Sequence, residues 1–396
     1  MIVLLCAASV LLFLSSWIYL PAPNRALLAL AVGAPELAAC LALGGLVVSL
    51  LAVVVPDRPS RRRWTLTLSI AATVLAAAPL VRLPFVILRF DAAMTTALGA
   101  DFLRDVPTDR RDRMRPSAAA VRPFFGFDDG GQTRVTRGIS FAAPEGVRLT
   151  LDVYRPSASG RYPVIVQVYG GAWQRGEPAD DAGFATYLAA RGYTVFAIDY
   201  RHAPAWTWPA QIEDVRTAIA WIRLHARDYD ADATRLALIG RSAGAHLAML
   251  AGYESKASIA AVVSYYGPVD LTDGYRNPPV PDPLNVRAIE EAFLGGTPDE
   301  RPDRYRAASP ITYVSRTVPP SLLIYGSRDH IVLSRYGAGL AERLRAAGAT
   351  SVFLEIPWAE HAFDAIPNGT SGQLSLYYTE RFLAWALTRS ARARQP

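Results

Sequence analysis

One stretch, residues 235–250, constrains the fold of this chain more than any other. The β-prone run Leu236–Ile239 meets a corner of small residues, Gly240–Gly244, and a helix-prone run follows. The corner matches G-x-S-x-G, in which a sharp strand-to-helix turn exposes the serine hydroxyl at the end of the strand. Glycines suit the flanking positions because a Cβ there would clash with the neighbouring strand and helix. The stretch predicts an exposed nucleophile at Ser242, although corners of this composition also serve packing alone.

The remainder of the chain predicts an α/β protein. The first two strand-like runs suit an antiparallel hairpin, and later strands alternate with helices, which indicates a mainly parallel sheet covered on both faces. Ligands of such sheets bind beyond the carboxyl ends of the strands. Residues 272–320 break the alternation with several prolines and predict a lid-like insertion over the site. The expected strands are 133–142, 147–154, 162–169, 194–198, 236–239, 259–265, 321–325 and 352–356, and the expected helices are 182–191, 209–226, 286–294, 335–347 and 375–387.

A serine nucleophile requires a base to accept its proton. Of the five histidines, His361 lies in a loop after a late strand, where its ring can reach Ser242. The other four suit the role less well. His225 is expected on the surface, and His330 faces the start of a helix. His202 follows a strand and either lines the pocket or packs a loop, and His246 lies on a helix one turn after the serine.

The base in turn requires an acid that fixes its tautomer. Asp329 follows the strand before the one that leads to His361, so the chain order is Ser, Asp, His, as in one known arrangement of this triad. A helix cap or a turn former is the structural alternative for Asp329. Three other aspartates compete for the role: Asp199, Asp214 and Asp270.

Backbone N–H groups near the serine are needed to stabilise an oxyanion. The N–H of Ala243, directly after the serine, is one candidate donor. The segment Gly170-Gly171-Ala172 follows an early strand and offers the others, because bare glycines let a ligand approach the backbone closely. The adjacent Trp173, together with His202, is a candidate substrate-pocket residue.

The first ninety residues contain most of the apolar excess of a chain that is 51% hydrophobic. Three runs, 2–20, 37–55 and 64–81, predict membrane-spanning helices. A secretory signal peptide is the alternative for the first run, but it has no basic n-region and is too long for an h-region. We therefore expect a multi-pass transmembrane region over 1–90, a connector over 91–130 that includes the aromatic cluster 124–127, and a catalytic domain over 131–396.

The orientation follows from the basic loop 57–63 between the second and third runs. The positive-inside rule places this loop in the cytoplasm, and three spans then place the large domain outside a bacterial cell membrane. Arginines beyond the third run, Arg82, Arg89 and Arg104, oppose this orientation more weakly, because they are more dilute. The bilayer is accordingly the expected partner of the N-terminal helices.

The net charge of +6 comes almost wholly from arginines interspersed with acids. They form no basic stripe, and no nucleic-acid-binding motif occurs, so a nucleic-acid partner is not expected. The two cysteines, Cys6 and Cys40, lie in apolar runs and offer no metal site. The sequence leaves the oligomeric state open.

Taken together, these motifs resemble the α/β-hydrolase superfamily, in particular its bacterial hormone-sensitive-lipase-like and acetyl-esterase branch. The resemblance covers about residues 133–390. It rests on Tyr169-Gly-Gly-Ala-Trp173, Asp199-Tyr-Arg-His-Ala-Pro204, Gly240-Arg-Ser-Ala-Gly244, Phe293-Leu-Gly-Gly296, Ala308-Ser-Pro310, Asp329 and His361-Ala-Phe363.

The resemblance implies a serine carboxylic-ester hydrolase that needs no metal or organic cofactor. It assigns Ser242, Asp329 and His361 to the catalytic triad, and the glycine-loop donors to Gly171 and Ala172, with Gly170 shaping the turn. The substrate would be a small-molecule or lipid ester with a short to medium acyl group. The chain departs from the family where Tyr169 replaces a histidine. Similarity to kynurenine formamidases and isoprenylcysteine methylesterases keeps amide hydrolysis open, as well as acyl transfer or a catalytically dead membrane scaffold.

Overall fold

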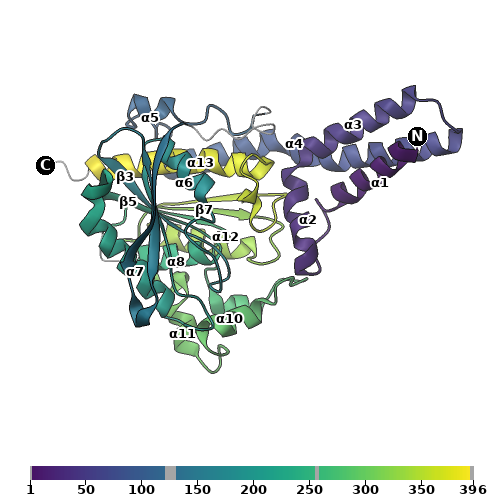
Figure 1. Ribbon diagram of the computed structural model, residues 1–396. Helices are drawn as coiled ribbons and strands as arrows, with labels where there is room; N and C mark the ends of the chain where they lie inside the picture. Colours follow the sequence, from purple (N-terminus) through teal and green to yellow (C-terminus); the bar gives the residue numbers. More distant parts are fainter. Residues whose placement is uncertain (1, 121–130, 255–257, 393–396) are drawn as a thin grey trace.

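An eight-stranded mixed sheet forms the centre of the computed structural model, which describes residues 2–120, 131–254 and 258–392 (Figure 1). The strand order is β1-β2-β4-β3-β5-β6-β7-β8; the pairs β1–β2 and β2–β4 are antiparallel and all others are parallel. The strands are β1 (Thr133–Ala142), β2 (Leu149–Pro156), β3 (Tyr162–Val168), β4 (Thr194–Ile198), β5 (Ala231–Arg241), β6 (Ala261–Tyr265), β7 (Ser321–Gly326) and β8 (Ser351–Ile356).

Helices cover both faces of the sheet, as the alternating pattern predicts. Helices α6 (Ala182–Ala190) and α13 (Thr370–Arg392) lie on one face, and α7 (Ala210–His225), α8 (Ala243–Glu254) and α12 (Ser334–Ala346) lie on the other (Figure 1). The central strands read as continuous apolar runs because both faces are buried. Parallel strands β3, β5, β6, β7 and β8 therefore end along one edge, where the loops that carry the candidate site residues meet.

The prediction was wrong at the bounds of two elements. Strand β5 begins at Ala231 instead of 236, because its polar first residues pair with the start of β3, where Tyr162 lies opposite Ala231. Helix α13 runs from Thr370 to Arg392 instead of 375–387. Its first turn is stabilised by a carboxylate from far away in the sequence, as described below.

The lid-like insertion 272–320 contains short helices and loops rather than strands. It comprises most of α9 (Leu271–Arg276), then α10 (Val286–Leu294), α11 (Pro302–Ala307) and η4 (Pro310–Tyr313). Helix α10 has the bounds expected from the sequence, and αL residues Asn285 and Gly295 cap its two ends. The insertion packs beside the carboxyl ends of the strands, with α10 and α11 at one end of the molecule (Figure 1).

The N-terminal region forms four helices where the sequence predicted three. They are α1 (Ile2–Ser16), α2 (Arg25–Glu36), α3 (Ala38–Val54) and α4 (Pro59–Leu98). Helices α1, α3 and the first half of α4 lie side by side and project from the sheet domain, whereas α2 lies against that domain (Figure 1). A bend of 77° separates α2 from α3.

By length and composition, α4 is the one described helix long and apolar enough to cross a membrane on its own, and the bent pair α2–α3 would add a second crossing if it acts as one span. Helix α1 is apolar but has only 15 residues. Within the described residues, all but three of the exposed large hydrophobic side chains lie between residues 2 and 88; the exceptions are Val135, Leu224 and Val280. The apolar excess of the sequence is therefore concentrated on the surface of the projecting helices.

Helix α4 joins the projecting helices to the sheet domain without a break. Pro79 and Pro84 lie inside it, and Pro79 is buried. Further along, Phe90 packs edge-to-face on Tyr378 of α13 at 5.3 Å, and the Tyr378 hydroxyl donates to Asp91 at 2.8 Å. The segment that the sequence assigned to a connector from residue 91 thus begins as a packed helix, while the aromatic cluster 124–127 lies outside the described residues.

Candidate active site

Ser242 occupies the turn between β5 and α8, in the left-handed region with φ 51°. The glycines on either side leave no room for a side chain. A Cβ on Gly240 would lie 2.3 Å from the Gly244 carbonyl carbon, and a Cβ on Gly244 would lie 2.2 Å from the Val168 oxygen of β3. A non-glycine residue in this backbone conformation carries strain, which is common at functional sites. Packing of the corner against β3 holds the serine in this conformation.

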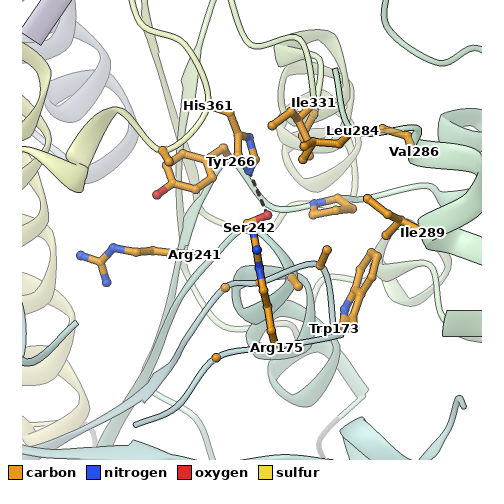
Figure 2. Close-up of a pocket in the computed structure, with 18 of the residues that line it drawn as sticks. Trp173, Arg175, Arg241, Ser242, Tyr266, Leu284, Val286, Ile289, Ile331 and His361 are labelled. Carbon is orange, nitrogen blue, oxygen red and sulfur yellow. Dashed lines mark hydrogen bonds between the residues drawn. The ribbon is translucent and has the colours of Figure 1, made fainter. Parts of the chain in front are cut away.

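A chain of hydrogen bonds runs from Ser242 through His361 to Asp329. Figure 2 shows its first link, between Ser242 and His361. The His361 Nε2 lies 2.9 Å from Ser242 Oγ, and its Nδ1 lies 2.8 Å from an Asp329 oxygen. The other Asp329 oxygen accepts the backbone N–H groups of Ile331 and Val332, each at 2.8 Å. Burial raises the pKa of Asp329 above its ordinary value, while His361 acts in the opposite direction. The structure therefore brings together the three residues that the sequence singled out.

The competing aspartates lie in other interactions. Asp214 is buried and makes a bidentate pair with Arg201, Asp270 caps the N-terminus of α9, and Asp199 accepts from the backbone of Tyr200 at 2.9 Å. None of these three is hydrogen-bonded to His361 in the described residues, which leaves Asp329 as its carboxylate partner.

The loop after β3 lies against the serine. A Cβ on Gly170 would approach the Ser242 Cβ to 3.4 Å and the Arg241 oxygen to 3.0 Å. Gly171 and Ala172 follow in left-handed conformations, with φ 123° and 58°. Together with Ala243 they line the cavity that holds Ser242, and their role as N–H donors to an oxyanion stays a prediction.

Tyr169 links this loop to the end of β4. Its hydroxyl donates to Asp199 at 2.6 Å and lies 2.9 Å from His202 Nε2, while its ring stacks on Tyr200 with centroids 4.5 Å apart. The tyrosine thus anchors the segment at the position where the resembling family has a histidine. The assignment of His202 to the pocket was wrong: among the described residues His202 does not line the cavity, because its ring is engaged by Tyr169.

Trp173 lines the cavity, and His246 holds its indole in place. The Trp173 Nε1–H donates to His246 Nδ1 at 3.2 Å, and His246 Nε2 lies 2.6 Å from the Ala308 oxygen of the insertion. Accepting at Nδ1 means that the proton is on Nε2 and is donated to Ala308. Burial lowers the pKa of His246 to about 4, so the ring is neutral. Sequence reasoning missed this role, although His246 lies one turn after Ser242.

A second histidine, His330, couples the aspartate loop to the histidine loop. Glu360 accepts from the His330 backbone at 2.7 Å and from the His361 backbone at 2.9 Å. The His330 Nδ1 lies 2.6 Å from the same carboxylate, which raises the pKa of His330 above its ordinary value. Glu360 is buried and directly precedes His361 in the chain. This neighbouring position is what the sequence offered to indicate its role.

Arg241, the residue before the serine, is buried and points away from Ser242 (Figure 2). Its guanidinium forms ion pairs with Asp181, at 3.2 Å, and with Asp364. It also lies over the Phe184 ring, 4.3 Å from the centroid. The Tyr266 hydroxyl donates to Asp364, and the Tyr266 ring packs on His361 with centroids 4.5 Å apart. Through Tyr266, this cluster contacts the ring of His361.

The cavity around Ser242 has a volume of about 730 Å³. Apolar side chains cover the side formed by the insertion and the loop after β7: Leu284, Val286, Ile289, Ile331 and Val332 (Figure 2). Glu290 also lines the cavity, and burial raises its pKa well above the ordinary value. Within the described residues, no group of three or more histidine, cysteine, aspartate or glutamate side chains could hold a metal ion.

The sheet topology, the strained serine corner and the residues gathered at the strand ends define an α/β-hydrolase. A match to the BD-FAE family covers residues 151–344. The chain is 39% identical to Esterase LipC of Mycobacterium tuberculosis over 226 residues, which are 53% of this chain and 55% of LipC. It is 33% identical to Esterase LipQ of the same organism over 294 residues, which are 69% of this chain and 68% of LipQ.

The chain therefore belongs to the esterase family of hormone-sensitive-lipase-like α/β-hydrolases that includes LipQ. It spans about half the length of LipC. Among solved structures, native esterase 2 of Thermogutta terrifontis is similar with a TM-score of 0.50 and 25% identity, covering 64% of this chain and 91% of that one. The BD-FAE match lies within the sheet domain, so it leaves the role of the N-terminal helices to be argued from the structure.

Proposed function

We propose that the protein is a membrane-anchored carboxylic-ester hydrolase that works through an acyl-enzyme. The observation that carries this proposal is the hydrogen-bonded chain from Ser242 through His361 to Asp329. In the first step, Ser242 Oγ attacks the ester carbonyl while His361 takes its proton and returns it to the leaving alcohol. Asp329 stabilises the imidazolium that forms, and water then releases the acyl group by the same steps.

The oxyanion of the tetrahedral intermediate would be held by backbone N–H groups. Ala243, Gly171 and Ala172 supply them at the serine, and Gly170 allows the close approach. Fixed dipoles of this kind stabilise the charge that develops in the transition state without having to reorient. The apolar side of the cavity would take the acyl group, and its volume suits short to medium chains.

The membrane anchor is proposed to be the bundle of α1, α3 and the first half of α4. Apart from arginines at the start of α4, its exposed side chains are largely apolar. Its helices approach closely through small residues: Ser49 and Ser69 share a hydrogen bond of 2.7 Å, and Gly45 leaves no room for a Cβ beside Thr73. Small interfacial residues and interhelical hydrogen bonds are typical of helices in lipid. The N-terminus and the basic loop 57–63 lie at the far end of the bundle, which supports a catalytic domain outside the cytoplasm (Figure 1).

Replacement of Ser242 by alanine tests the chemistry. We expect Ser242→Ala to lower kcat/KM for p-nitrophenyl acetate by about four orders of magnitude or more, because the nucleophile is absent. A fluorophosphonate probe should label the wild-type protein but not the variant. Activity retained in a folded Ser242→Ala protein, or no labelling of the wild type, would contradict the proposal. Parallel rates on an N-formyl aromatic amide distinguish ester from amide hydrolysis, and an acceptor-dependent product would indicate acyl transfer.

A further inference from the structure

Helix α2 contributes directly to the active-site cavity, although it belongs to the N-terminal region. Two of its residues, Arg25 and Leu28, line the same cavity as Ser242 and His361. The bend of 77° after Glu36 turns α2 out of line with α3 and lays it against the sheet domain, between that domain and the projecting helices (Figure 1). An anchor that served only as a tether would have no reason to reach the catalytic site.

Contacts at both ends hold α2 in this position. At its C-terminus, the buried Glu36 carboxylate accepts the backbone N–H groups of Ser371 at 2.7 Å and Gly372 at 3.4 Å, at the start of α13. A negative charge or acceptor at a helix N-terminus satisfies N–H groups that have no partner inside the helix. At the other end, Asn24 caps α2 through the Leu27 N–H, and Arg328 donates to the Tyr19 carbonyl just before the helix.

Helix α2 also packs on the segment that carries the base. It contacts η5 (Phe363–Ala365), which follows His361 after a single residue, and it contacts α13. An element from the N-terminal region therefore lines the cavity together with the sheet domain. In consequence, the space beside Ser242 depends on which side chains α2 presents.

Leu28 connects the cavity to the apolar bundle. Besides lining the cavity, it packs against a buried apolar cluster formed by residues of the N-terminal region: Trp17, Ile18, Ala22, Ala31, Ala34, Ala38, Leu41 and Ala76. Beyond this cluster lie the exposed apolar faces of α1, α3 and α4. Leu28 thus places an apolar side chain between the cavity and the apolar cluster of the bundle.

On these grounds we propose that α2 selects the substrate, and that Leu28 contacts the apolar chain of an ester drawn from the lipid layer around the bundle. The substrate class is then an amphiphilic ester whose apolar chain is of medium length. This inference rests on the proposed ester hydrolysis and extends it, because it assigns chain-length selection to the N-terminal region. Leu28 is a specificity residue that touches substrate and has no part in the chemical steps.

The test compares the full-length protein and its variants in phosphatidylcholine vesicles. For each protein, kcat/KM is measured with p-nitrophenyl dodecanoate and with p-nitrophenyl acetate, and the ratio of the two values is the readout. We expect Leu28→Gln to lower this ratio about tenfold, because a polar group replaces an apolar contact with the dodecanoyl chain. Leu28→Trp should also lower it, since the larger ring occupies the space that the chain needs.

Ala29→Gln is the matched control, because it introduces the same polar group on an exposed position of the same helix. Its ratio should equal that of the wild type. An equal ratio in Leu28→Gln and Ala29→Gln would overturn the inference, provided that the wild type hydrolyses both esters and Ser242→Ala hydrolyses neither. No hydrolysis by the wild type, or hydrolysis by Ser242→Ala, would instead defeat the proposed function on which the inference rests.

A second measurement tests the route from the lipid. With the total amount of p-nitrophenyl dodecanoate held constant, plain phosphatidylcholine is added to dilute the ester within the vesicles. Entry from the lipid layer predicts a rate that falls with the mole fraction of ester in the bilayer. A rate that follows only the total concentration of ester would overturn this route.

Discussion

His246 shows how a residue outside the reacting atoms can determine the site. It ties Trp173, next to the glycine loop, to the Ala308 carbonyl of the insertion. Both of its ring nitrogens are used, and burial keeps the ring neutral. A substitution here therefore disturbs the loop backbone that would hold the oxyanion as well as the cavity wall.

We expect His246→Gln to lower kcat for p-nitrophenyl acetate about tenfold with a smaller change in KM, because positioning of the donors matters most in the transition state. The measurement determines kcat and KM separately for the variant and the wild type. His225→Gln, a histidine on α7 outside the cavity lining, is the control and should behave as the wild type. A loss in KM alone would point to substrate binding at Trp173 instead.

The same residue predicts a pH dependence of stability. The pKa of His246 is about 4 in the folded protein and about 6.5 when unfolded, so the unfolded chain binds more protons between these values. The contribution of His246 to the free energy of unfolding, about 3 kcal/mol, is complete above about pH 6.5 and is lost as the pH falls towards 4. His246→Gln should flatten this part of the profile of Tm against pH, measured by circular dichroism. An unchanged slope would mean that other groups cause it.

At the scale of the element, the serine corner depends on the backbone of two strands and one helix meeting within van der Waals distance. Gly244 is the second residue of α8 and lies against the end of β3. A Cβ on Gly244 would lie 2.2 Å from the Val168 oxygen and 2.2 Å from the Tyr169 oxygen. The glycine is therefore required by packing and not by φ. This is the reason that the sequence reasoning gave for the corner.

Gly244→Ala should accordingly lower both Tm and kcat/KM, the latter by about a hundredfold or more, because backbone rather than a flexible side chain has to move. Gly339→Ala on α12 is the matched control, since nothing lies within 4 Å of its added Cβ. There the substitution should leave activity unchanged and stabilise the helix slightly. Wild-type activity in Gly244→Ala would show that the corner has more room than the structure indicates.

Local patterns predicted most elements because each depends on its own residues. The bounds of α10 and the position of each strand follow from apolar runs and caps that the sequence carries. The errors occur where distant residues decide. The first turn of α13 is stabilised by Glu36, more than 300 residues earlier, and the ring of His202 is engaged by Tyr169 from the loop after β3. The triad Ser242, Asp329 and His361 could be predicted because each residue follows the end of a predicted strand.

For the whole molecule, the sequence predicted an apolar N-terminal region but not its relation to the site. The expected runs left out residues 25–36, which form α2, because the bend after Glu36 depends on docking to the sheet domain. The expected runs 2–20, 37–55 and 64–81 fall on α1, α3 and the first half of α4. Their number as membrane crossings stays a prediction.

Topology can be checked by labelling single cysteines. In a background of Cys6→Ser and Cys40→Ser, we expect Ser159→Cys, on the exposed surface of the sheet domain, to react with a membrane-impermeant maleimide in intact cells. Ser60→Cys, beside the basic loop, should react only after the membrane is opened. The reverse pattern would place the catalytic domain in the cytoplasm, and labelling of both in intact cells would exclude a spanning bundle.

The unbroken course of α4 has a consequence for how the enzyme meets its substrate. Its 40 residues span about 60 Å, with the first half in the bundle and the second half packed on the sheet domain, so no swivel separates the two. If the bundle is embedded as proposed, the height and tilt of Ser242 over the lipid surface are fixed. The enzyme would then search in two dimensions, and its encounter rate would depend on lateral diffusion and on the surface density of esters.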